Sequence, residues 1–281
     1  YKGDIMKMKS WIEKDFNHAE DWVLLTGASS GIGYEYLKLL CELGCNVITV
    51  SNEKDKLFQD KNQLQEKYGN KVRPLYYDLS DYQEIDALVA EISKYSISCL
   101  INNAGFGLKG RFEDHLPEKY RDIIMVNSMA PVIITRAILP KMQKANRGCV
   151  IHVSSINAYL PIPNNQVYTA TKSFCMNYAL AVARENRSSK IVFHLVLPGT
   201  TLTPFHQKQG AQPANMTMTP DIVAQRSFDN LHKQVFIPNK ADRFLPWIVK
   251  QLPINWAMDF ASYLLRKRLG TAKRRLSDQE T

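Results

Sequence analysis

The chain has 281 residues, of which 45% are hydrophobic and 22% charged, and this composition excludes a largely disordered protein. The formal net charge is +9. Part of the excess gathers near the C-terminus, in Arg266, Lys267, Arg268, Lys273, Arg274 and Arg275. A basic run can contact nucleic acid or anionic lipid, but it is more often simply solvated. We therefore expect no nucleic-acid partner.

Cysteine and histidine usage bears on compartment and metal binding. The five cysteines include no CxxC pair, and most lie in apolar segments, which favours buried thiols in a reducing compartment over disulfides. The six histidines form no HxxxH or HExxH motif, so we expect no metal site. Residues 1–20 form a polar leader without the apolar core of a signal peptide, and no uninterrupted apolar run reaches the ~18–20 residues of a membrane span. These features predict a cytoplasmic protein.

From residue 21 to about 240, short apolar runs alternate with helical patterns. The expected strands are Trp22–Thr26, Asn46–Val50, Val72–Tyr76, Cys99–Asn102, Cys149–Ser154, Ile191–Leu197 and Val235–Ile237. The expected helices are Ile32–Leu43, Lys54–Tyr68, Tyr82–Lys94, Glu118–Met142, Val167–Glu185 and Pro220–His232. Strands that are apolar on both faces and separated by helices predict an α/β fold, a Rossmann-like, doubly wound parallel sheet in one domain.

The first expected strand runs directly into a glycine-rich turn, Thr26-Gly27-Ala28-Ser29-Ser30-Gly31-Ile32-Gly33, after which a helical pattern begins. Glycines allow a sharp turn, a close approach of the backbone to a pyrophosphate, and tight helix–strand packing. The helix N-terminus then offers free N–H groups to phosphates. This strand–turn–helix context predicts a dinucleotide-binding domain over residues 21–240.

The end of the second strand usually distinguishes NAD from NADP, because an acidic residue there binds the ribose 2′-hydroxyl. Here the strand ends in Ser51 and Asn52, and Lys54 follows shortly after. Serine does not repel a 2′-phosphate and Lys54 could neutralise one, so we expect NADP(H) to be favoured, with NAD(H) left open.

Ser155, Tyr168 and Lys172 form a chemically coherent set. Tyr168 and Lys172 are four residues apart and share one face of a helix, and Ser155 ends the fifth strand. A nearby ammonium favours the phenolate and should lower the pKa of Tyr168 from about 10. The tyrosine can then exchange a proton with a substrate oxygen, to which Ser155 donates a hydrogen bond.

These motifs, in this order, closely resemble those of the short-chain dehydrogenase/reductase family over roughly residues 21–238. The resemblance implies that Ser155, Tyr168 and Lys172 are catalytic and adds Asn127 as a fourth member, which holds a proton-relaying water. It implies that Asp78 and Leu79 contact the adenine. It further implies cofactor contacts for Asn103, Ala104, Gly105, Pro198, Gly199, Thr201 and Thr203. Within the family the chain resembles bacterial oxidoreductases that are similar to 3-oxoacyl and hydroxysteroid reductases, and a homodimer or tetramer is expected.

The substrate cleft should be closed by the segment from Leu202 to Met218. Within and opposite it we single out Tyr159, Phe205 and His206 as candidate substrate contacts, which suggests a small-molecule substrate with an apolar body. Two other functions remain open for the fold, a non-catalytic nucleotide-binding regulator and a membrane-surface protein.

Residues 241–268 form an apolar and basic extension that Pro246 and Pro253 interrupt, and residues 269–281 form a basic tail. The apolar side chains of the extension are Phe244, Trp247, Ile248, Leu252, Ile254, Trp256, Met258, Phe260, Tyr263, Leu264 and Leu265. The segment either packs as helices on its own domain or a second subunit, or rests on a membrane surface through its aromatic side chains.

Overall fold

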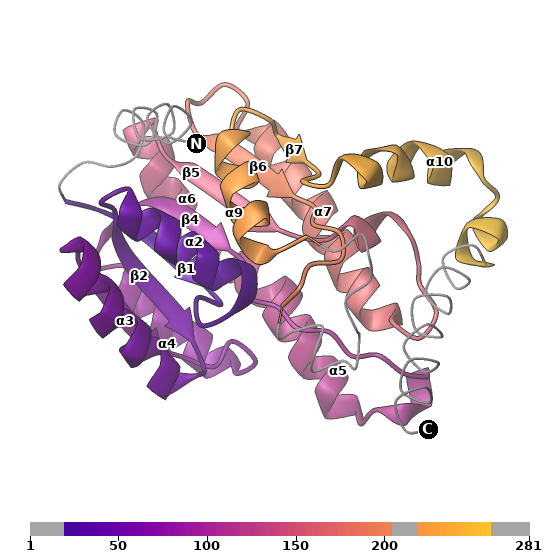
Figure 1. Cartoon of the computed structure of the whole chain (residues 1–281), viewed down its shortest axis with the longest axis horizontal. Coiled ribbons are helices and arrows are strands. Elements are labelled where there is room, and N and C mark those ends of the chain that lie inside the picture. The colour runs from indigo at the N-terminus through magenta and orange to yellow at the C-terminus, as the bar shows by residue number, and fades with distance from the viewer. Residues whose placement is uncertain (1–19, 204–217, 260–281) are drawn as a thin grey trace, which may run out of the picture.

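The structure is a computed structural model, and it describes residues 20–203 and 218–259 (Figure 1). Seven parallel strands form one sheet in the order β3-β2-β1-β4-β5-β6-β7. Their bounds are β1 Asp21–Thr26, β2 Asn46–Ser51, β3 Val72–Tyr76, β4 Ser96–Asn102, β5 Cys149–Val153, β6 Val192–Val196 and β7 Val235–Phe236. The predicted strands are confirmed, although β4 begins three residues before the expected Cys99.

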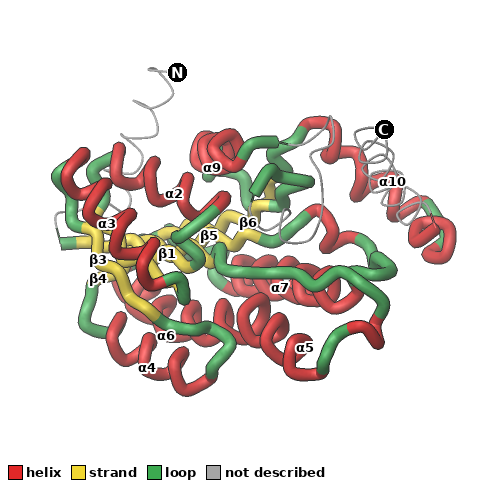
Figure 2. The backbone as a smooth tube through the Cα atoms, turned by 60° about the horizontal axis from the view of Figure 1, so that its bottom comes forward, coloured by secondary structure: helices red, strands yellow, loops and turns green. Residues whose placement is uncertain are grey.

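Helices cover both faces of the sheet (Figure 2). The main helices are α2 Gly31–Glu42, α3 Lys54–Tyr68, α4 Tyr82–Ile92, α5 Pro117–Ile124, α6 Ala130–Ala145, α7 Gln166–Glu185 and α9 Pro220–Asp229. Alternate residues of β1 enter two separate cores: Val23 packs with Tyr36 of α2 and Phe228 of α9, whereas Leu24 packs with Leu88 of α4. The strands are therefore buried on both faces, as the continuous apolar runs predict.

The long helix expected over Glu118–Met142 contains a π-helical turn, η2, over Met125–Met129, between α5 and α6. By length and composition alone the stretch Pro117–Ala145 could cross a membrane, but core helices meet the same test, and α6 buries Ile134, Ile138 and Met142 in the core beneath the sheet. π-turns are frequent at functional sites. This one carries Asn127.

The strand order places a crevice at the carboxyl edge of the sheet. Successive strands run outward in opposite directions from β1 and β4, so the connections after these two strands diverge to opposite sides. In open α/β sheets, ligands bind at such a switch point. The fold therefore positions the ends of β1, β4, β5 and β6 around one site.

The C-terminal segment packs partly on its own domain. After β7 it forms the 3₁₀ turn η4 Lys240–Phe244 and the helix α10 Leu245–Gln251. Ala257, Val249 and Leu252 contact Leu160 and Ile162 in a small apolar cluster. This confirms the expected packing for these residues, whereas the leader up to residue 19 and everything from residue 260 lie outside the described residues.

Candidate active site

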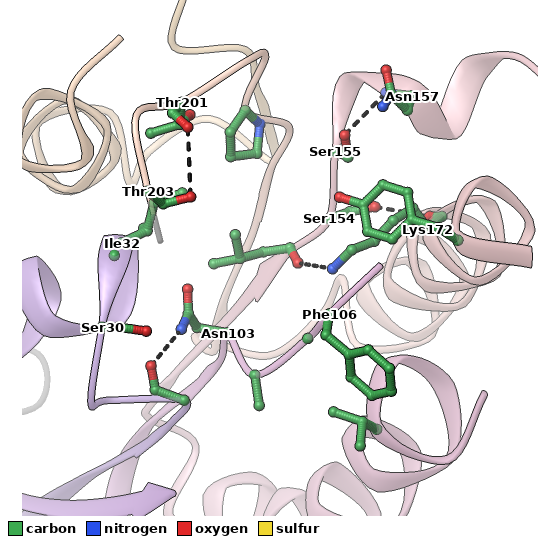
Figure 3. A pocket seen from close by; sticks show the side chains of 18 of the residues that line it. Ser30, Ile32, Asn103, Phe106, Ser154, Ser155, Asn157, Lys172, Thr201 and Thr203 are labelled. Carbon is green, nitrogen blue, oxygen red and sulfur yellow. Dashed lines mark hydrogen bonds between the residues drawn. The ribbon is translucent and has the colours of Figure 1, made fainter. Parts of the chain in front are cut away.

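A cavity of about 820 Å³ opens at the carboxyl edge of the sheet, where the loops after β1, β2, β4, β5 and β6 meet (Figure 3). The predicted cofactor residues that line it are Gly27, Ser29, Ser30, Gly31, Ile32, Ser51, Asn52, Asp78, Leu79, Asn103, Ala104, Gly105, Pro198, Gly199, Thr201 and Thr203. Ser155, Tyr168 and Lys172 line the same cavity. The structure thus brings most of the predicted glycine turn and three of the predicted catalytic residues to one cavity, whereas the predicted Gly33 and Asn127 do not line it.

The glycine turn leaves no room for side chains at two positions. Gly27 has φ +68°, and a Cβ there would lie 2.7 Å from the Cα of Ala104. A Cβ on Gly33 would lie 1.9 Å from the carbonyl oxygen of Gly27. Ser30, the N-cap of α2, makes no side-chain hydrogen bond to the helix, so the N-terminal N–H groups stay available for an anion. These features fit a bound pyrophosphate.

Asn103 fastens this turn to the end of β4. Its Nδ2 donates to the carbonyl oxygens of Thr26 at 3.1 Å and Gly27 at 3.0 Å. The backbone N–H groups of Asn103 and Ala104 both donate to Thr26 Oγ1 at 3.1 Å. The side chain of Asn103 therefore holds the phosphate loop in place from within the protein. This structural role comes in addition to the cofactor contact that the resemblance implies.

The adenosine end of the cavity differs from the expectation at one residue. Ser51 Oγ donates to Ser29 Oγ at 3.0 Å and accepts from the N–H of Glu53 at 3.1 Å. Lys54 does not line the cavity; its Nζ lies over the ring of Tyr76, 5.9 Å from the centroid. The suggestion that Lys54 neutralises a 2′-phosphate is therefore not supported, because the helix that starts at Lys54 directs its side chain to the aromatic ring.

The adenine-side residues Asp78 and Leu79 follow β3. One carboxylate oxygen of Asp78 accepts from the N–H of Ser80 at 2.9 Å and from its hydroxyl at 2.8 Å. Leu79 is buried between this turn and the core. The pair forms a fixed wall of the cavity with one polar and one apolar side chain.

The catalytic cluster lies where β5 meets α7. Tyr168 and Lys172 are both buried, one helical turn apart. The Ser155 and Tyr168 side chains are hydrogen-bonded, and Ser155 Oγ also accepts from the N–H of Asn157 at 3.2 Å. Lys172 Nζ donates to the carbonyl oxygen of Val153 at 3.1 Å. The end of β5 thus orients both the serine and the lysine.

Asn127 joins the loop after β4 to α7. Its Nδ2 donates to the carbonyl of Phe106 at 2.9 Å and to Thr171 Oγ1 at 3.0 Å, while its Oδ1 accepts from the N–H of Phe106 at 3.1 Å. An amide has two N–H donors, and both are used here. A water relayed to the lysine, as the resemblance implies, would have to donate to Oδ1 or use the main chain of η2.

Gly105 is the spacer between Asn127 and Lys172. A Cβ at this position would lie 3.0 Å from Asn127 Oδ1 and 3.2 Å from Lys172 Nζ. The close approach explains why glycine is suited to the third position of the Asn103-Ala104-Gly105 turn: a side chain would press on two catalytic groups.

The protonation of the cluster is governed by burial. Burial raises the pKa of Tyr168 to about 12, and the hydrogen bond with Ser155 acts in the opposite direction. Burial also lowers the pKa of Lys172. The expected lowering of the tyrosine pKa by the lysine is therefore not found, and burial sets the direction of the shift. At neutral pH the phenol keeps its proton.

The cavity wall includes residues beyond the predicted domain boundary at 240. Ala241, Asp242, Leu245 and Ile248, from η4 and α10, line it. Asp242 packs so closely on Gly199 that a Cβ on the glycine would lie 2.0 Å from the carboxylate. The C-terminal extension is therefore part of the site, a contribution that no local sequence signal revealed.

Of the three candidate substrate residues, only Tyr159 lies within the described part of the chain. Tyr159, at the end of the η3 turn (Ile156–Tyr159), does not line the large cavity; it packs against the apolar cluster of Ala179, Leu195 and Leu197 and lines a second, smaller cavity. Phe205 and His206 lie outside the described residues. The substrate side is lined by Leu160 and Ile162, which the sequence places opposite the expected lid, and by four residues that the sequence did not single out, namely Phe106, Lys109, Asn157 and Asn165. Among the described residues no cluster of three or more metal-ligating side chains occurs.

A doubly wound parallel sheet, an open glycine turn at its switch point and a buried Ser–Tyr–Lys cluster facing the same cavity define a dinucleotide-dependent dehydrogenase site. The family model described as short chain dehydrogenase matches residues 21–214. The chain belongs to this family.

Relatives and solved structures agree with this assignment. The chain is 28% identical over 182 residues to a very-long-chain 3-oxoacyl-CoA reductase of Bos taurus, covering 63% of this chain and only 58% of the relative. A reductase of the same name from Kluyveromyces lactis is 32% identical over 185 residues, covering 63% of this chain and 54% of the relative.

Two solved structures are similar over most of the chain. A short-chain dehydrogenase from Sphingobium yanoikuyae in complex with NADPH has a TM-score of 0.76 at 26% identity, covering 82% of this chain and 93% of that one. A structure reported for 7beta-hydroxysteroid dehydrogenase stereoselectivity has a TM-score of 0.81 at 22% identity, covering 89% and 98%, and shows a common fold.

Proposed function

We propose that this protein is an NADP(H)-dependent oxidoreductase that interconverts a ketone and a secondary alcohol on a substrate with an apolar body. The observation that carries the proposal is the buried, mutually hydrogen-bonded Ser155–Tyr168 pair, with Lys172 one helical turn from the tyrosine, in the same cavity as the glycine turn. A non-catalytic nucleotide-binding regulator would not need this complete set.

The residues present fit a dinucleotide. The open N-terminus of α2 and the turn from Gly27 to Gly33 would hold the pyrophosphate, and the turn at Asp78 and Leu79 would hold the adenine. When bound, the nicotinamide supplies the hydride that the reaction transfers to or from carbon. The remaining steps belong to the protein side chains.

Tyr168 donates its proton to the substrate oxygen as that oxygen gains negative charge, and Ser155 donates a hydrogen bond to the same oxygen. Lys172, held by the Val153 carbonyl, stands beside both Tyr168 and Gly105 and stabilises negative charge that develops on the phenol oxygen. Because the tyrosine pKa lies well above neutral pH, the site is prepared as a proton donor. This protonation state suits Tyr168 to act as the proton donor when a carbonyl group is reduced. A panel of 3-oxoacyl thioesters, oxosteroids and small ketones, assayed by NADPH and NADH oxidation, tests the proposal.

We expect a modest preference for NADPH. The end of β2 carries the neutral Ser51 and Asn52, which do not repel a 2′-phosphate, and the similar Sphingobium yanoikuyae structure contains NADPH; Glu53, which follows them, also lines the cavity and keeps the expected preference small. Because no cation has been identified beside the 2′-phosphate, and even a partly exposed charge contact would contribute only about 1 kcal/mol, the ratio of kcat/KM should be about tenfold at most. Ser51→Asp should reverse it, because the carboxylate repels phosphate and accepts from a 2′-hydroxyl.

The measurement is kcat/KM with both cofactors for the wild type, for Ser51→Asp and for the control Ser51→Asn, whose side chain has the shape of aspartate without its charge. The control should lose the bond to Ser29 without reversing the preference. A wild type that favours NADH contradicts the cofactor assignment, and an unchanged ratio in Ser51→Asp means that the ribose lies elsewhere.

We also propose that α10 and the turn before it rest on an anionic membrane surface. Trp247 and Trp256 are 66% and 68% exposed, and Phe244 is equally exposed, whereas Leu245 and Ile248 face the cavity. Figure 1 shows α10 projecting beyond the helices that cover the sheet. From residue 240 onward the sequence has nine Lys or Arg and four Asp or Glu. Tryptophan at an apolar–polar boundary beside excess positive charge suits anionic lipid.

Vesicle co-sedimentation tests this contact. The wild type should bind phosphatidylcholine vesicles containing phosphatidylserine, and Trp247→Ser with Trp256→Ser should weaken binding by about tenfold or more. The control is Phe58→Ser with Tyr82→Ser, which removes two exposed aromatic rings from α3 and α4. Absence of vesicle binding by the wild type would contradict the membrane contact. A dimer of the wild type that the tryptophan variant alone fails to form would instead assign this face to a second copy of the chain.

Exposed apolar side chains and buried cysteines indicate an oligomeric state and a compartment. Ile124, Met129 and Phe174 expose apolar surface along α5, η2 and α7, and we propose that this surface forms a homodimer interface. All five cysteines are buried free thiols, which supports a reducing compartment such as the cytoplasm.

A further inference from the structure

The substrate end of the cavity is mainly apolar, and the polar side chains in its wall include two that lie on loops paired with each other. Phe106, Leu160, Ile162 and Ile248 provide the apolar lining. Lys109, in the loop after β4, and Asn165, at the start of α7, line the same cavity. The reaction as described above uses neither of them. Their surroundings indicate what they recognise.

Asn165 is a buried amide without a hydrogen-bond partner. It is 6% exposed, and its Oδ1 has no hydrogen-bond partner in the structure as described. It occupies the N-cap position of α7, yet its side chain makes no capping bond. The preceding Asn164 has φ +60°, an unusual left-handed conformation that turns the chain at this point. No hydrogen bond of its Nδ2 occurs among the described residues either, so its N–H groups are available to donate to a ligand in the cavity, whereas the unpaired Oδ1 is an acceptor and does not bind an anion.

Lys109 is brought beside this amide by backbone hydrogen bonds. The N–H of Gly110, its chain neighbour, donates to the carbonyl oxygen of Asn164 at 3.0 Å. The carbonyl oxygen of Lys109 itself is hydrogen-bonded to His115 Nε2 at 3.1 Å. The two loops are therefore fixed to each other, so that a lysine and an unpaired amide border one cavity.

The Lys109 ammonium has no counter-charge among the described residues. It is half-buried, and no ion pair or hydrogen bond of its Nζ occurs there, while burial lowers its pKa. The nearby acidic groups are engaged elsewhere: Asp114 accepts from the N–H of Arg111 at 2.7 Å, and Asp122 pairs with Lys119 and Arg121. A partly desolvated cation without a partner is stabilised by an anionic ligand.

We propose that Lys109 and Asn165 bind an oxyanion, a carboxylate or a phosphate, at the end of the substrate remote from its carbonyl group. The inference rests on the proposed function and narrows the substrate class to apolar ketones that carry a negative charge. The ammonium pairs with the oxyanion, and the amide N–H groups of Asn165 donate a second hydrogen bond to it.

Matched substrates test the proposal and separate the two sources of charge. The first pair is an oxosteroid carboxylic acid and its methyl ester; the second is a medium-chain 3-oxoacyl-CoA and its uncharged N-acetylcysteamine thioester. The wild type should prefer the charged member of at least one pair by about 10–100-fold in kcat/KM, mainly through KM. Preference in the first pair alone assigns a carboxylate, and preference in the second alone assigns a phosphate.

Variants then locate the charge recognition. Lys109→Met should remove the preference by raising KM for the charged member more than for the neutral one, Lys109→Arg should keep most of it, and Asn165→Ala should reduce it by about 3–10-fold. Lys119→Met is the control, an exposed lysine on the same cavity that is paired with Asp122. If Lys109→Met and Lys119→Met lost the preference for the charged substrate equally, the cavity would attract anions through its overall positive charge, and the proposed site would be wrong.

A binding measurement distinguishes failure of this inference from failure of the proposed function. Calorimetry should show dodecanoate, or dodecyl phosphate, binding to the wild type at least about tenfold more tightly than dodecanol, with the difference lost in Lys109→Met. If neutral ketones are turned over but no anion is preferred in either assay, this inference is wrong. If no ketone of any charge is turned over, the proposed function itself is wrong.

Discussion

Replacing Tyr168 by phenylalanine is expected to lower kcat for ketone reduction by about 10²–10⁴-fold, the usual loss on removing a general acid. The phenol is buried, its pKa is raised to about 12, and it is hydrogen-bonded to Ser155, so at neutral pH it holds the proton that the substrate oxygen needs. The ring itself is retained in phenylalanine, and the packing of α7 should not change.

The affinity for NADPH, followed by its fluorescence, should stay within a few fold in the same variant, because the hydroxyl serves proton transfer. Tyr159→Phe is the matched control, since Tyr159 packs outside the cavity against Met176 and Leu195. It should retain nearly full activity. More than a few per cent of the wild-type rate in Tyr168→Phe would show that another group protonates the substrate.

Gly33→Ala is expected to abolish nucleotide binding and to lower the free energy of unfolding by more than about 2 kcal/mol. The added Cβ would lie 1.9 Å from the carbonyl oxygen of Gly27 and 2.5 Å from Asn103 Nδ2, so the phosphate turn must move away from α2. The same displacement breaks the bonds by which Asn103 holds the turn to β4.

Gly44→Ala is the comparison, because its Cβ would meet nothing within 4 Å and only the left-handed backbone, φ +79°, opposes it. That variant should lose about 1 kcal/mol and keep its cofactor affinity. Chemical denaturation and NADPH titration of both variants provide the measurement. Normal NADPH affinity in Gly33→Ala would contradict the close packing on which the phosphate site depends.

The features that were predictable from the sequence are those in which adjacent residues act together. Gly27 to Gly33 joins one strand to the helix that follows, and Tyr168 and Lys172 share one face of a single helix. The seven strands were recognisable because burial on both faces requires continuous apolar runs. These local patterns located the phosphate turn and the catalytic cluster.

The features that could not be predicted depend on contacts between distant segments. Lys109 and Asn165 border the same cavity because a backbone hydrogen bond from Gly110 to Asn164 joins their two loops. Asp242 reaches Gly199 only after the chain has passed β7. Nothing in the sequence around these residues marks them as parts of one cavity.

Local conformation accounts for the remaining differences. The η3 turn directs Tyr159 away from the cavity, and the start of α3 directs Lys54 onto Tyr76. The π-turn at Asn127 interrupts a helix whose apolar pattern is otherwise continuous. The sign of the Tyr168 pKa shift depends on how deeply the ring is buried, which residue spacing does not report.

The most direct test of the proposed reaction is isotope transfer from NADPH carrying deuterium at C4 of the nicotinamide, prepared as each of the two C4 epimers. After incubation with an apolar ketone, we expect one deuterium on the carbinol carbon of the alcohol from one epimer and none from the other, and we expect that signal to be lost in Tyr168→Phe. NADPH oxidation that leaves the alcohol unlabelled with both epimers, or nucleotide binding without any reduction across the ketone panel, would contradict it.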